Sequence, residues 1–443
     1  MNRQDKKELR QQIVCEWLEE NYLQFGSLRH DVVTDRLQIR MADSLEDAAS
    51  GYSLEFRGKK NWRNLTDKDI NTMVCNCVEE TQVNISVTEM WTVLKSDRVP
   101  SVHPIREWLN TLPPYTPDQP DWIDLVAQQV TVKPLGEEAK GDKARGEELW
   151  RTCFKKWFVA MVASWMHDEV VNHTALVLVG RQGIFKTTWL ERLIPPALRA
   201  YSSKMPLNGQ ISKDDRLRLC ENAMLNIDEL DAICGREMNI VKSLLTSTDV
   251  NERAAYGRLK ERRMRLASFC ASTNNREFLT DVTGNRRWLP FEVESIQNPF
   301  HTIIPYERLY AQAKALVEEG IFSYWFDMEE MEVLEAHNEE FRALENEEEL
   351  LKVYFAVPAS DSMNSKFLTT AEISEKLISA GNIKRPMSLS RLGMILGQHG
   401  FIASRKGTPA RRGWIVYERD SEEINAERKL LSKTPIASTD SIY

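Results

Sequence analysis

Buried strands and intervening helices alternate between residues 174 and 293. Three nearly uninterrupted apolar runs predict strands that are buried on both faces, at 175–179, 223–227 and 266–271. Segments near them predict helices over 188–193, 213–220 and 239–248. A fourth strand is expected from Trp288 to Val293. This alternation predicts an α/β core with a parallel sheet, in which the third strand lies between the first two.

The region before this core predicts a small α+β module and a connecting segment. An amphipathic helix is expected over residues 1–26 and a hairpin around Thr34-Asp35. A strand should follow at 52–56, and helices should begin near Asp67 and cover 87–95 and 105–111. Four prolines between 113 and 120 indicate a linker. Helices then follow over 122–130 and 146–166, and the second is apolar on more than one side, so it should pack against the core or a neighbouring subunit.

The C-terminal third changes from acidic to basic. Residues 327–349 hold eleven carboxylates and one arginine, and they predict one long acidic helix with a solvated face. Residues 362–417 hold nine basic and two acidic side chains. Helices over 371–379 and 391–398, the second capped by Ser388 or Ser390, precede a hairpin whose basic tip spans 405–412. This order predicts a winged helix whose second helix reads DNA and whose wing contacts phosphates. The alternative is a protein-docking module.

Composition restricts the class of protein. A chain of 443 residues with 42% apolar residues predicts two to four packed domains. The net charge of −8 excludes a polycation, so nucleic acid would have to bind local basic patches. Seven cysteines without a CxxC pair indicate buried thiols in a reducing compartment. The chain has no apolar signal region and no run of 18 apolar residues, so a cytoplasmic protein without a membrane partner is expected.

The first buried strand leads into a glycine-bearing loop and a helix start, VGRQGIFKTT. Loop N–H groups and a helix N-terminus form an anion cradle, so this order predicts a phosphate-binding P-loop. Lys186 would reach the β- and γ-phosphates and Thr187 would bind Mg²⁺. Phe185 departs from the motif, which has glycine there. The alternative is a buried strand and turn with an incidental lysine. The expected nucleotide-binding residues are Gly180, Gln182, Gly183, Lys186, Thr187 and Thr188.

Polar residues follow the other strands at the same edge. Asp228 would hold Mg²⁺ through water and Glu229 would polarise the attacking water. The alternative is an ordinary solvated end of a strand. The third strand ends at 272–275 in polar residues, one of which could orient the water. Arg286 and Arg287 follow a glycine turn and could neutralise charge that develops on the phosphate, or they could be surface residues that close a hairpin.

A basic hairpin precedes the third strand. Residues 251–265 hold six basic and two acidic side chains. The basic residues would contact nucleic-acid phosphates and Tyr256 could stack on a base. The alternative is a solvated charged hairpin. The expected contacts are Arg253, Tyr256, Arg258 and Lys260, together with Arg405, Lys406, Arg411 and Arg412 of the wing.

The blocks VGRQGIFKTT, LNIDEL, AAYGRLKERRMRLASFCASTNN and DVTGNRRWLPFEV resemble the virulence-associated protein E family. Those proteins are P-loop ATPases of phages and mobile elements, similar to superfamily 3 helicases and to the helicase half of phage primase-helicases. The resemblance implies that Asp228 and Glu229 form the Walker B pair and that Asn274 is the sensor. It also implies that Arg286 or Arg287 is the arginine finger and that the basic hairpin lines the pore of a ring.

The predicted fold is an α/β, AAA+-like P-loop ATPase with an N-terminal α+β module and a C-terminal winged helix. The expected segments are the module (1–112), a linker and helix (113–145), the ATPase (146–326), an acidic connector helix (327–357), the winged helix (358–420) and a tail (421–443). The expected function is an ATP- and Mg²⁺-dependent motor on single-stranded or forked DNA. A homo-hexamer is expected, and a separate primase or replication protein is an implied partner. The alternatives are a DNA-dependent ATPase that remodels or loads a complex, and a nucleotide-gated DNA-binding regulator.

Overall fold

The computed structural model describes residues 3–40, 62–134, 143–205, 211–228, 230, 235–252, 260–279, 285–343, 346–358, 365–381, 383, 386–406 and 411–431. The chain divides into two compact units. The first comprises Met1–Asn274 with Phe291–Asp327, and the second comprises Asn275–Pro290 with Met328–Tyr443. Among the described residues, no helix is long and apolar enough to cross a membrane.

The N-terminal part of the first unit is an α+β arrangement with its own core. Helix α1 (Arg3–Leu18) ends earlier than predicted and continues as a π-helix, Glu19–Leu23. Strands β1 (Leu28–Asp31) and β2 (Arg36–Arg40) form the predicted hairpin, with Asp35 at a φ of 54° in its turn. β3 (Trp62–Asn64) and β4 (Ser101–Val102) complete the sheet in the order β3-β2-β1-β4. The strand predicted at 52–56 lies outside the described residues.

Three short helices follow at the predicted places. Capping boxes at Thr66 and Ser86 begin α2 (Asp67–Thr81) and α3 (Val87–Leu94), because each hydroxyl accepts from an N–H that would otherwise have no partner. Helix α4 (Pro104–Asn110) begins at a proline, which suits the first turn. Apolar residues of α1, α2 and α3 form a continuous core with β1 and β2.

The central sheet of the first unit has six strands in the order β5-β12-β6-β11-β8-β7. The strands are β5 (Val130–Val132), β6 (Ala175–Val179), β7 (Ser202–Lys204), β8 (Met224–Ile227), β11 (Ser268–Thr273) and β12 (Trp288–Ile296). β6, β11, β8 and β7 run parallel, and β11 lies between β6 and β8 as predicted. Every residue of β6, β8 and β11 is buried, which explains their continuous apolar runs.

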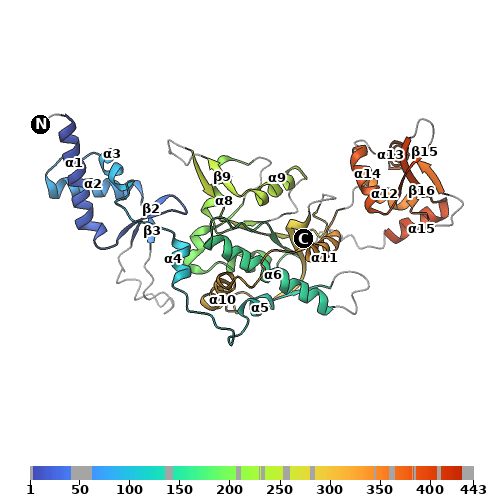
Figure 1. Ribbon diagram of the computed structural model, residues 1–443, viewed down its shortest axis with the longest axis horizontal. Helices are drawn as coiled ribbons and strands as arrows, with labels where there is room; N and C mark the ends of the chain where they lie inside the picture. Colours follow the sequence, from blue (N-terminus) through green and yellow to red (C-terminus); the bar gives the residue numbers. More distant parts are fainter. Residues whose placement is uncertain are drawn as a thin grey trace, which may run out of the picture. The chain divides into compact units, whose positions relative to one another are not determined.

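A tryptophan-rich helix and a neighbouring helix support this sheet. Helix α6 (Lys143–Met166) and helix α10 (Tyr306–Glu319) run side by side (Figure 1), and Trp165 stacks on Tyr310 with ring centroids 5.5 Å apart. The indole N–H groups of α6 donate to backbone carbonyls, Trp157 to Phe269 and Trp165 to Ala223. These bonds satisfy each buried N–H, so the apolar sides of α6 are explained by burial within this unit.

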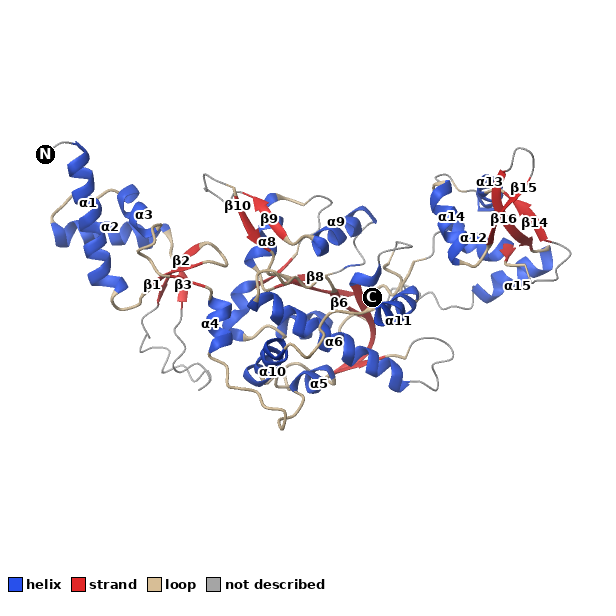
Figure 2. Cartoon of the chain, viewed as in Figure 1, coloured by secondary structure: helices blue, strands red, loops and turns tan. Residues whose placement is uncertain are grey.

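Shorter helices connect the strands, as Figure 2 shows. They are α5 (Trp122–Ala127), α7 (Lys186–Arg192), α8 (Lys213–Glu221) and α9 (Gly235–Thr246). The predicted basic hairpin is present as the antiparallel strands β9 (Asp249–Glu252) and β10 (Glu261–Met264). Its tip, residues 253–259, lies outside the described residues.

The predicted long acidic helix in the second unit is wrong. The structure has two helices, α11 (Met328–Glu339) and α12 (Asn346–Tyr354). The backbone between them pairs with Leu279, whose N–H donates to Phe341 and whose carbonyl accepts from Ala343. Arg342 is buried there and pairs with the fully buried Glu348. A buried ion pair needs a fixed geometry that a continuous solvated helix cannot provide.

The C-terminal part of the second unit shows the predicted order of helix, helix and hairpin. It contains β13 (Phe355–Ala356), β14 (Ser365–Leu368), α13 (Thr370–Gly381), α14 (Leu389–Gln398), β15 (Ile402–Lys406) and β16 (Arg411–Glu418). Ser388 caps α14 through the N–H of Arg391. Residues Ser421–Leu431, at the start of the predicted tail, form helix α15. Asp420 accepts from the first N–H groups of α15, and Arg428 donates to Tyr354.

Candidate functional site

Most of the predicted site residues of the first unit line one cavity. It has a volume of about 360 Å³ and lies at the carboxyl ends of β6, β8 and β11. Its lining consists of Gln182, Gly183, Phe185, Lys186, Thr187, Thr188, Asp228, Ser272, Thr273 and Asn274. The parallel strands place these residues together because their carboxyl ends share one edge, where open α/β sheets bind ligands.

The loop of residues 180–185, called the glycine loop below, connects β6 to α7. Gly180 has a φ of +154°, and a Cβ there would lie 3.1 Å from both the Ile184 Cδ1 and the Val293 carbonyl oxygen. Gly183 has a φ of +84°. Both conformations are unfavourable for residues with a side chain. The two glycines therefore allow the loop to turn tightly above the sheet.

Phe185 has the left-handed conformation where the motif has glycine. Its φ is 69° and its ψ is 17°, and it precedes the first residue of α7. A left-handed L-residue costs about 1–2 kcal/mol. Its ring contacts the exposed ring of Phe300 edge-on, with centroids 6.2 Å apart. The loop backbone thus keeps the conformation of a glycine although the residue is bulky and lines the cavity.

Lys186 is buried at the floor of this loop. Its ammonium donates to the carbonyls of Gly180 at 2.6 Å and Arg181 at 2.8 Å, and to the Asn274 Oδ1 at 3.0 Å. The contact with Asn274 brings together two residues that are 88 positions apart. Lys186 therefore sits where a phosphate in the loop would meet its charge.

Thr187 and Asp228 are in direct contact, and Ser272 joins them in a way that the sequence did not indicate. The Thr187 hydroxyl donates to the Asp228 Oδ1 at 3.1 Å, and the Ser272 hydroxyl contacts the same oxygen at 3.0 Å. Burial by itself raises the pKa of the Asp228 carboxyl. Hydrogen bonds from Lys204 and from these two hydroxyls outweigh burial and hold this pKa below its ordinary value, so Asp228 is ionised at neutral pH.

The donor set fits Mg²⁺. Hydroxyl and carboxylate oxygens are its preferred protein ligands, and one or two suffice when the remaining ligands are phosphates and water. Thr187, Asp228 and Ser272 supply such oxygens beside the glycine loop. Among the described residues, no cluster of three or more His, Cys, Asp and Glu could hold a metal ion alone. The site therefore suits a metal ion that arrives with a phosphate ligand.

Three further site residues were predicted from the sequence. Glu229 lies outside the described residues. Arg286 and Arg287 belong to the second unit, in a 3-10 turn before β12, where the Asn338 amide donates to the Asn285 carbonyl. Arg286 is exposed and Arg287 is partly buried. Their role as arginine finger remains a prediction.

The basic hairpin has less free charge than its sequence suggests. Arg262 pairs with Asp249, and Arg263 pairs with Glu221 and donates to the Val33 carbonyl. Arg265 is buried, and its guanidinium donates to backbone carbonyls that include those of Leu244, Leu245 and Asn172. Three of the six basic residues are therefore used within the fold. Lys260 is exposed, whereas Arg253, Tyr256 and Arg258 lie outside the described residues.

The four basic residues predicted for the wing are exposed and face one another across the hairpin. Arg405 pairs in register with Arg412, and Lys406 with Arg411. Like charges at opposite positions destabilise a hairpin. By contrast, Lys366 and Lys376 of the same region pair with Glu418. The exposed residues of α14 include Leu389 and Met394, and its single basic residue, Arg391, is partly buried. Positive charge is therefore concentrated on the hairpin and not on this helix.

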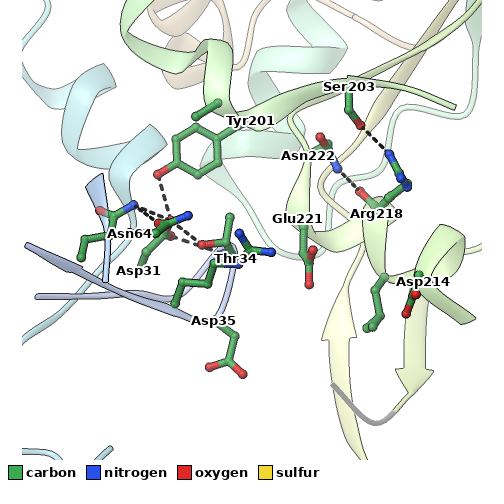
Figure 3. Close-up of a pocket in the computed structure, with 14 residues that line it drawn as sticks. Asp31, Thr34, Asp35, Asn64, Tyr201, Ser203, Asp214, Arg218, Glu221 and Asn222 are labelled. Carbon is green, nitrogen blue, oxygen red and sulfur yellow. Dashed lines mark hydrogen bonds between the residues drawn. The ribbon is translucent and has the colours of Figure 1, made fainter. Parts of the chain in front are cut away.

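A second cavity of the first unit, about 680 Å³ in volume, lies beside the β1–β2 hairpin. Figure 3 shows Asp31 at its wall, where Tyr201 donates to the Asp31 Oδ2 at 2.9 Å. Thr34 donates to the same oxygen at 2.7 Å, and the Val33 N–H donates to the Asp31 Oδ1 at 2.9 Å. Asp31 is fully buried and well supplied with donors, so we interpret it as a structural anchor of the N-terminal strands.

Comparisons with solved structures find distant similarity along most of the chain. The A form apo structure of the NrS-1 C-terminal region (305–718) matches with 11% identity and a TM-score of 0.42, and the match covers 89% of this chain and 97% of that one. The SCCmec type IV Cch active helicase matches with 10% identity and a TM-score of 0.35, and the match covers 90% and 94%. No curated protein matches this chain.

The family comparison is specific to the central region. The model of the virulence-associated protein E-like domain matches residues 141–343. These residues include β6, β8 and β11, the glycine loop and the described lining of the 360 Å³ cavity. The resemblance drawn from the sequence blocks is thereby confirmed. Over residues 141–343 the chain is similar to the virulence-associated protein E-like domain.

Proposed function

We propose that this protein is an ATP- and Mg²⁺-dependent DNA motor of the replicative helicase type, built on a P-loop ATPase core and acting as a ring. The observation that carries the proposal is the meeting of Lys186, Thr187 and Asp228 in one cavity beneath the glycine loop. Asn274 joins them from the strand between the other two. A phosphate cradle, a metal-binding hydroxyl and carboxylate, and a polar group near the terminal phosphate are the recurring parts of such ATPases.

The contacts of Lys186 suggest how the site receives ATP. Its ammonium now bonds the carbonyls of Gly180 and Arg181, and it would exchange them for phosphate oxygens. Because Lys186 is buried, its charge acts with little screening by solvent. Thr187 and Asp228 would hold Mg²⁺, which neutralises charge on the phosphates. Asn274, released from Lys186, would orient the attacking water.

The DNA-binding part of the proposal is supported by the wing. Helices α13 and α14 followed by the β15–β16 hairpin have the order of a winged helix. The four cations of that hairpin repel one another across the strands, and DNA phosphates would relieve this repulsion. Because no charged side chain dominates the exposed side of α14, we infer that the wing binds the backbone without reading sequence. Lys260 would contact DNA from the basic hairpin.

The primary test is phosphate release by the purified protein with and without single-stranded DNA. Two variants test the site, Lys186→Ala at the cavity and Arg286→Ala at the expected finger. The control is Lys133→Ala, at an exposed lysine of the first unit that pairs with Glu292. We expect DNA-stimulated release that is lost in the first two variants and retained in Lys133→Ala. Binding of nucleotide without phosphate release under any DNA condition would contradict the motor.

Strand separation distinguishes the motor from its first alternative. A helicase separates a forked duplex, whereas an ATPase that remodels or loads a complex releases phosphate without separating strands. The expected hexamer is tested on the same samples by the mass of the particle with ATP and DNA. A monomer under all conditions would contradict the ring.

Phe185 favours one further candidate, a nucleotide-gated DNA-binding regulator. Its bulky side chain lines the cavity from a strained left-handed position. Slow turnover with intact ATP and duplex binding would support this candidate. Phe185→Gly then becomes the decisive variant, because it restores the residue of the motif. A regulator whose turnover is limited by Phe185 should hydrolyse ATP faster after this substitution.

A further inference from the structure

The carboxylate of Asp228 is shared between the cavity and a lysine outside its lining. Its Oδ1 accepts from Thr187 and Ser272, on the side of the glycine loop. Its Oδ2 accepts from the Lys204 ammonium at 2.7 Å. Both oxygens of the expected metal-binding carboxylate are therefore engaged, and one of them is neutralised by a protein cation.

The position of Lys204 allows its ammonium to move away from Asp228. It is the last residue of β7, which is the edge strand of the sheet, and its side chain is 59% exposed. A second acceptor is already close, because the Glu191 Oε1 on α7 lies 3.8 Å from the same ammonium. If the ammonium moves from Asp228 to Glu191, one exposed ion pair replaces another. The free-energy cost of this movement is therefore small.

Lys204 and a metal ion would compete for the Asp228 carboxylate, because both are positively charged. A divalent cation beside Thr187 and Asp228 would lie close to the Lys204 ammonium, and the two positive charges would repel each other. Before Mg²⁺ binds, the same ammonium compensates the charge of Asp228 and adds positive potential for an arriving polyphosphate. Lys204 therefore favours the metal-free site and opposes the metal-loaded site.

We propose that Lys204 is a resident counter-cation for Asp228 that binds Glu191 when Mg²⁺ enters, and that it thereby sets how strongly nucleotide binding depends on Mg²⁺. The inference rests on the proposed nucleotide site. It makes Lys204 a positioning residue for Asp228 and assigns a second function to Glu191. Neither role requires that the site hydrolyse ATP.

The test is the affinity of the full chain for a fluorescent, non-hydrolysable ATP analogue in Mg²⁺ and in EDTA. The readout is the ratio of the two dissociation constants, Kd in EDTA over Kd in Mg²⁺. Lys204→Met should bind more tightly in Mg²⁺ and more weakly in EDTA, and thereby raise the ratio by about tenfold. Lys204→Arg keeps the charge and should retain a ratio close to that of the wild type. Glu191→Gln removes the alternative acceptor and should lower the ratio.

Lys133→Met is the matched control. Lys133 is also a half-exposed lysine of the first unit, and its ammonium contacts the Glu292 carboxylate on a neighbouring strand at 2.5 Å. Its removal should leave the ratio unchanged. If Lys204→Met changes both affinities by the same factor, Lys204 is merely structural and the inference is overturned, although the proposed nucleotide site stands. If the wild type binds no nucleotide in either condition, both fail.

Discussion

The left-handed conformation of Phe185 leads to a quantitative prediction. At this position a glycine variant should be more stable than an alanine variant, which is the reverse of the usual order. Both Phe185→Gly and Phe185→Ala lose the ring and its contact with Phe300, which is worth about 0.5–1.5 kcal/mol. They differ in the backbone. Alanine keeps a strain of about 1–2 kcal/mol at a φ of 69°, whereas glycine relieves it. Glycine pays about 0.5–1 kcal/mol in backbone entropy.

We therefore expect Phe185→Gly to be more stable than Phe185→Ala by about 1 kcal/mol. The measurement is urea unfolding of the nucleotide-free protein, followed by tryptophan fluorescence, because Trp157, Trp165 and Trp189 are all buried in the first unit. The comparison uses the transition of that unit and requires equal m-values.

The control is Thr152, an exposed residue in the interior of α6. There Thr152→Ala should be more stable than Thr152→Gly by about 1 kcal/mol, the usual order in a helix. Backbone strain at Phe185 is refuted if the alanine variant is as stable as the glycine variant, or more stable, while the control behaves normally. That result would mean that the loop relaxes out of the left-handed conformation when the ring is removed.

Three other perturbations follow from contacts in the structure. Glu348→Gln should destabilise the second unit by about 3 kcal/mol in denaturant titrations at pH 7, because it removes the buried charge partner of Arg342 and leaves only the half-exposed Glu339. Burial by itself raises the pKa of Glu348, but hydrogen bonds from Arg342 and His399 outweigh it and lower this pKa to about 2. The contribution of Glu348 to stability is therefore complete above the unfolded-state pKa of about 4.3 and is lost as the pH falls toward 2. A variant whose stability has the same pH dependence as that of the wild type below pH 5 would contradict this role of Glu348. Gly180→Ala should lower the thermal midpoint and cost about 1–3 kcal/mol, since its Cβ would lie 3.1 Å from a β12 carbonyl oxygen; an unchanged midpoint would show that the loop can move. Replacing Arg405 or Arg412 by serine should weaken duplex binding equally for all sequences and reduce the slope of log K against log salt by about 1 each, measured by fluorescence anisotropy; a loss confined to one sequence would instead indicate base reading.

Local sequence patterns predicted the elements of the core well. The strand that precedes the glycine loop and the strand that ends at Asp228 are continuous apolar runs, and such runs form strands buried on both faces. Ser388, one of the two predicted caps, begins α14, and the structure adds caps at Thr66 and Ser86. These signals are local, because a cap and an apolar run can both be recognised from neighbouring positions in the chain.

Predictions from local patterns were wrong where a residue contacts a partner that is distant in the sequence. The acidic segment reads as one helix, yet the backbone next to Arg342 pairs with residue 279. Its carboxylates also look alike in the sequence, but Glu348 is buried against Arg342 whereas Glu339 is half-exposed. Charge counts had the same weakness, since three basic residues of the hairpin are neutralised or buried within the fold.

The sequence by itself determined the order of the glycine loop, Lys186, Thr187 and Asp228 along the chain, and this order predicts a site for a phosphate and a metal ion. Only the tertiary structure decided what surrounds them. The parallel order of β6, β11, β8 and β7 places Ser272 and Lys204 on the Asp228 carboxylate, although the sequence indicated no contact of either residue with Asp228. The physical reason is that hydrogen bonds and charges act across a few ångströms of space, whereas sequence patterns record only distance along the chain.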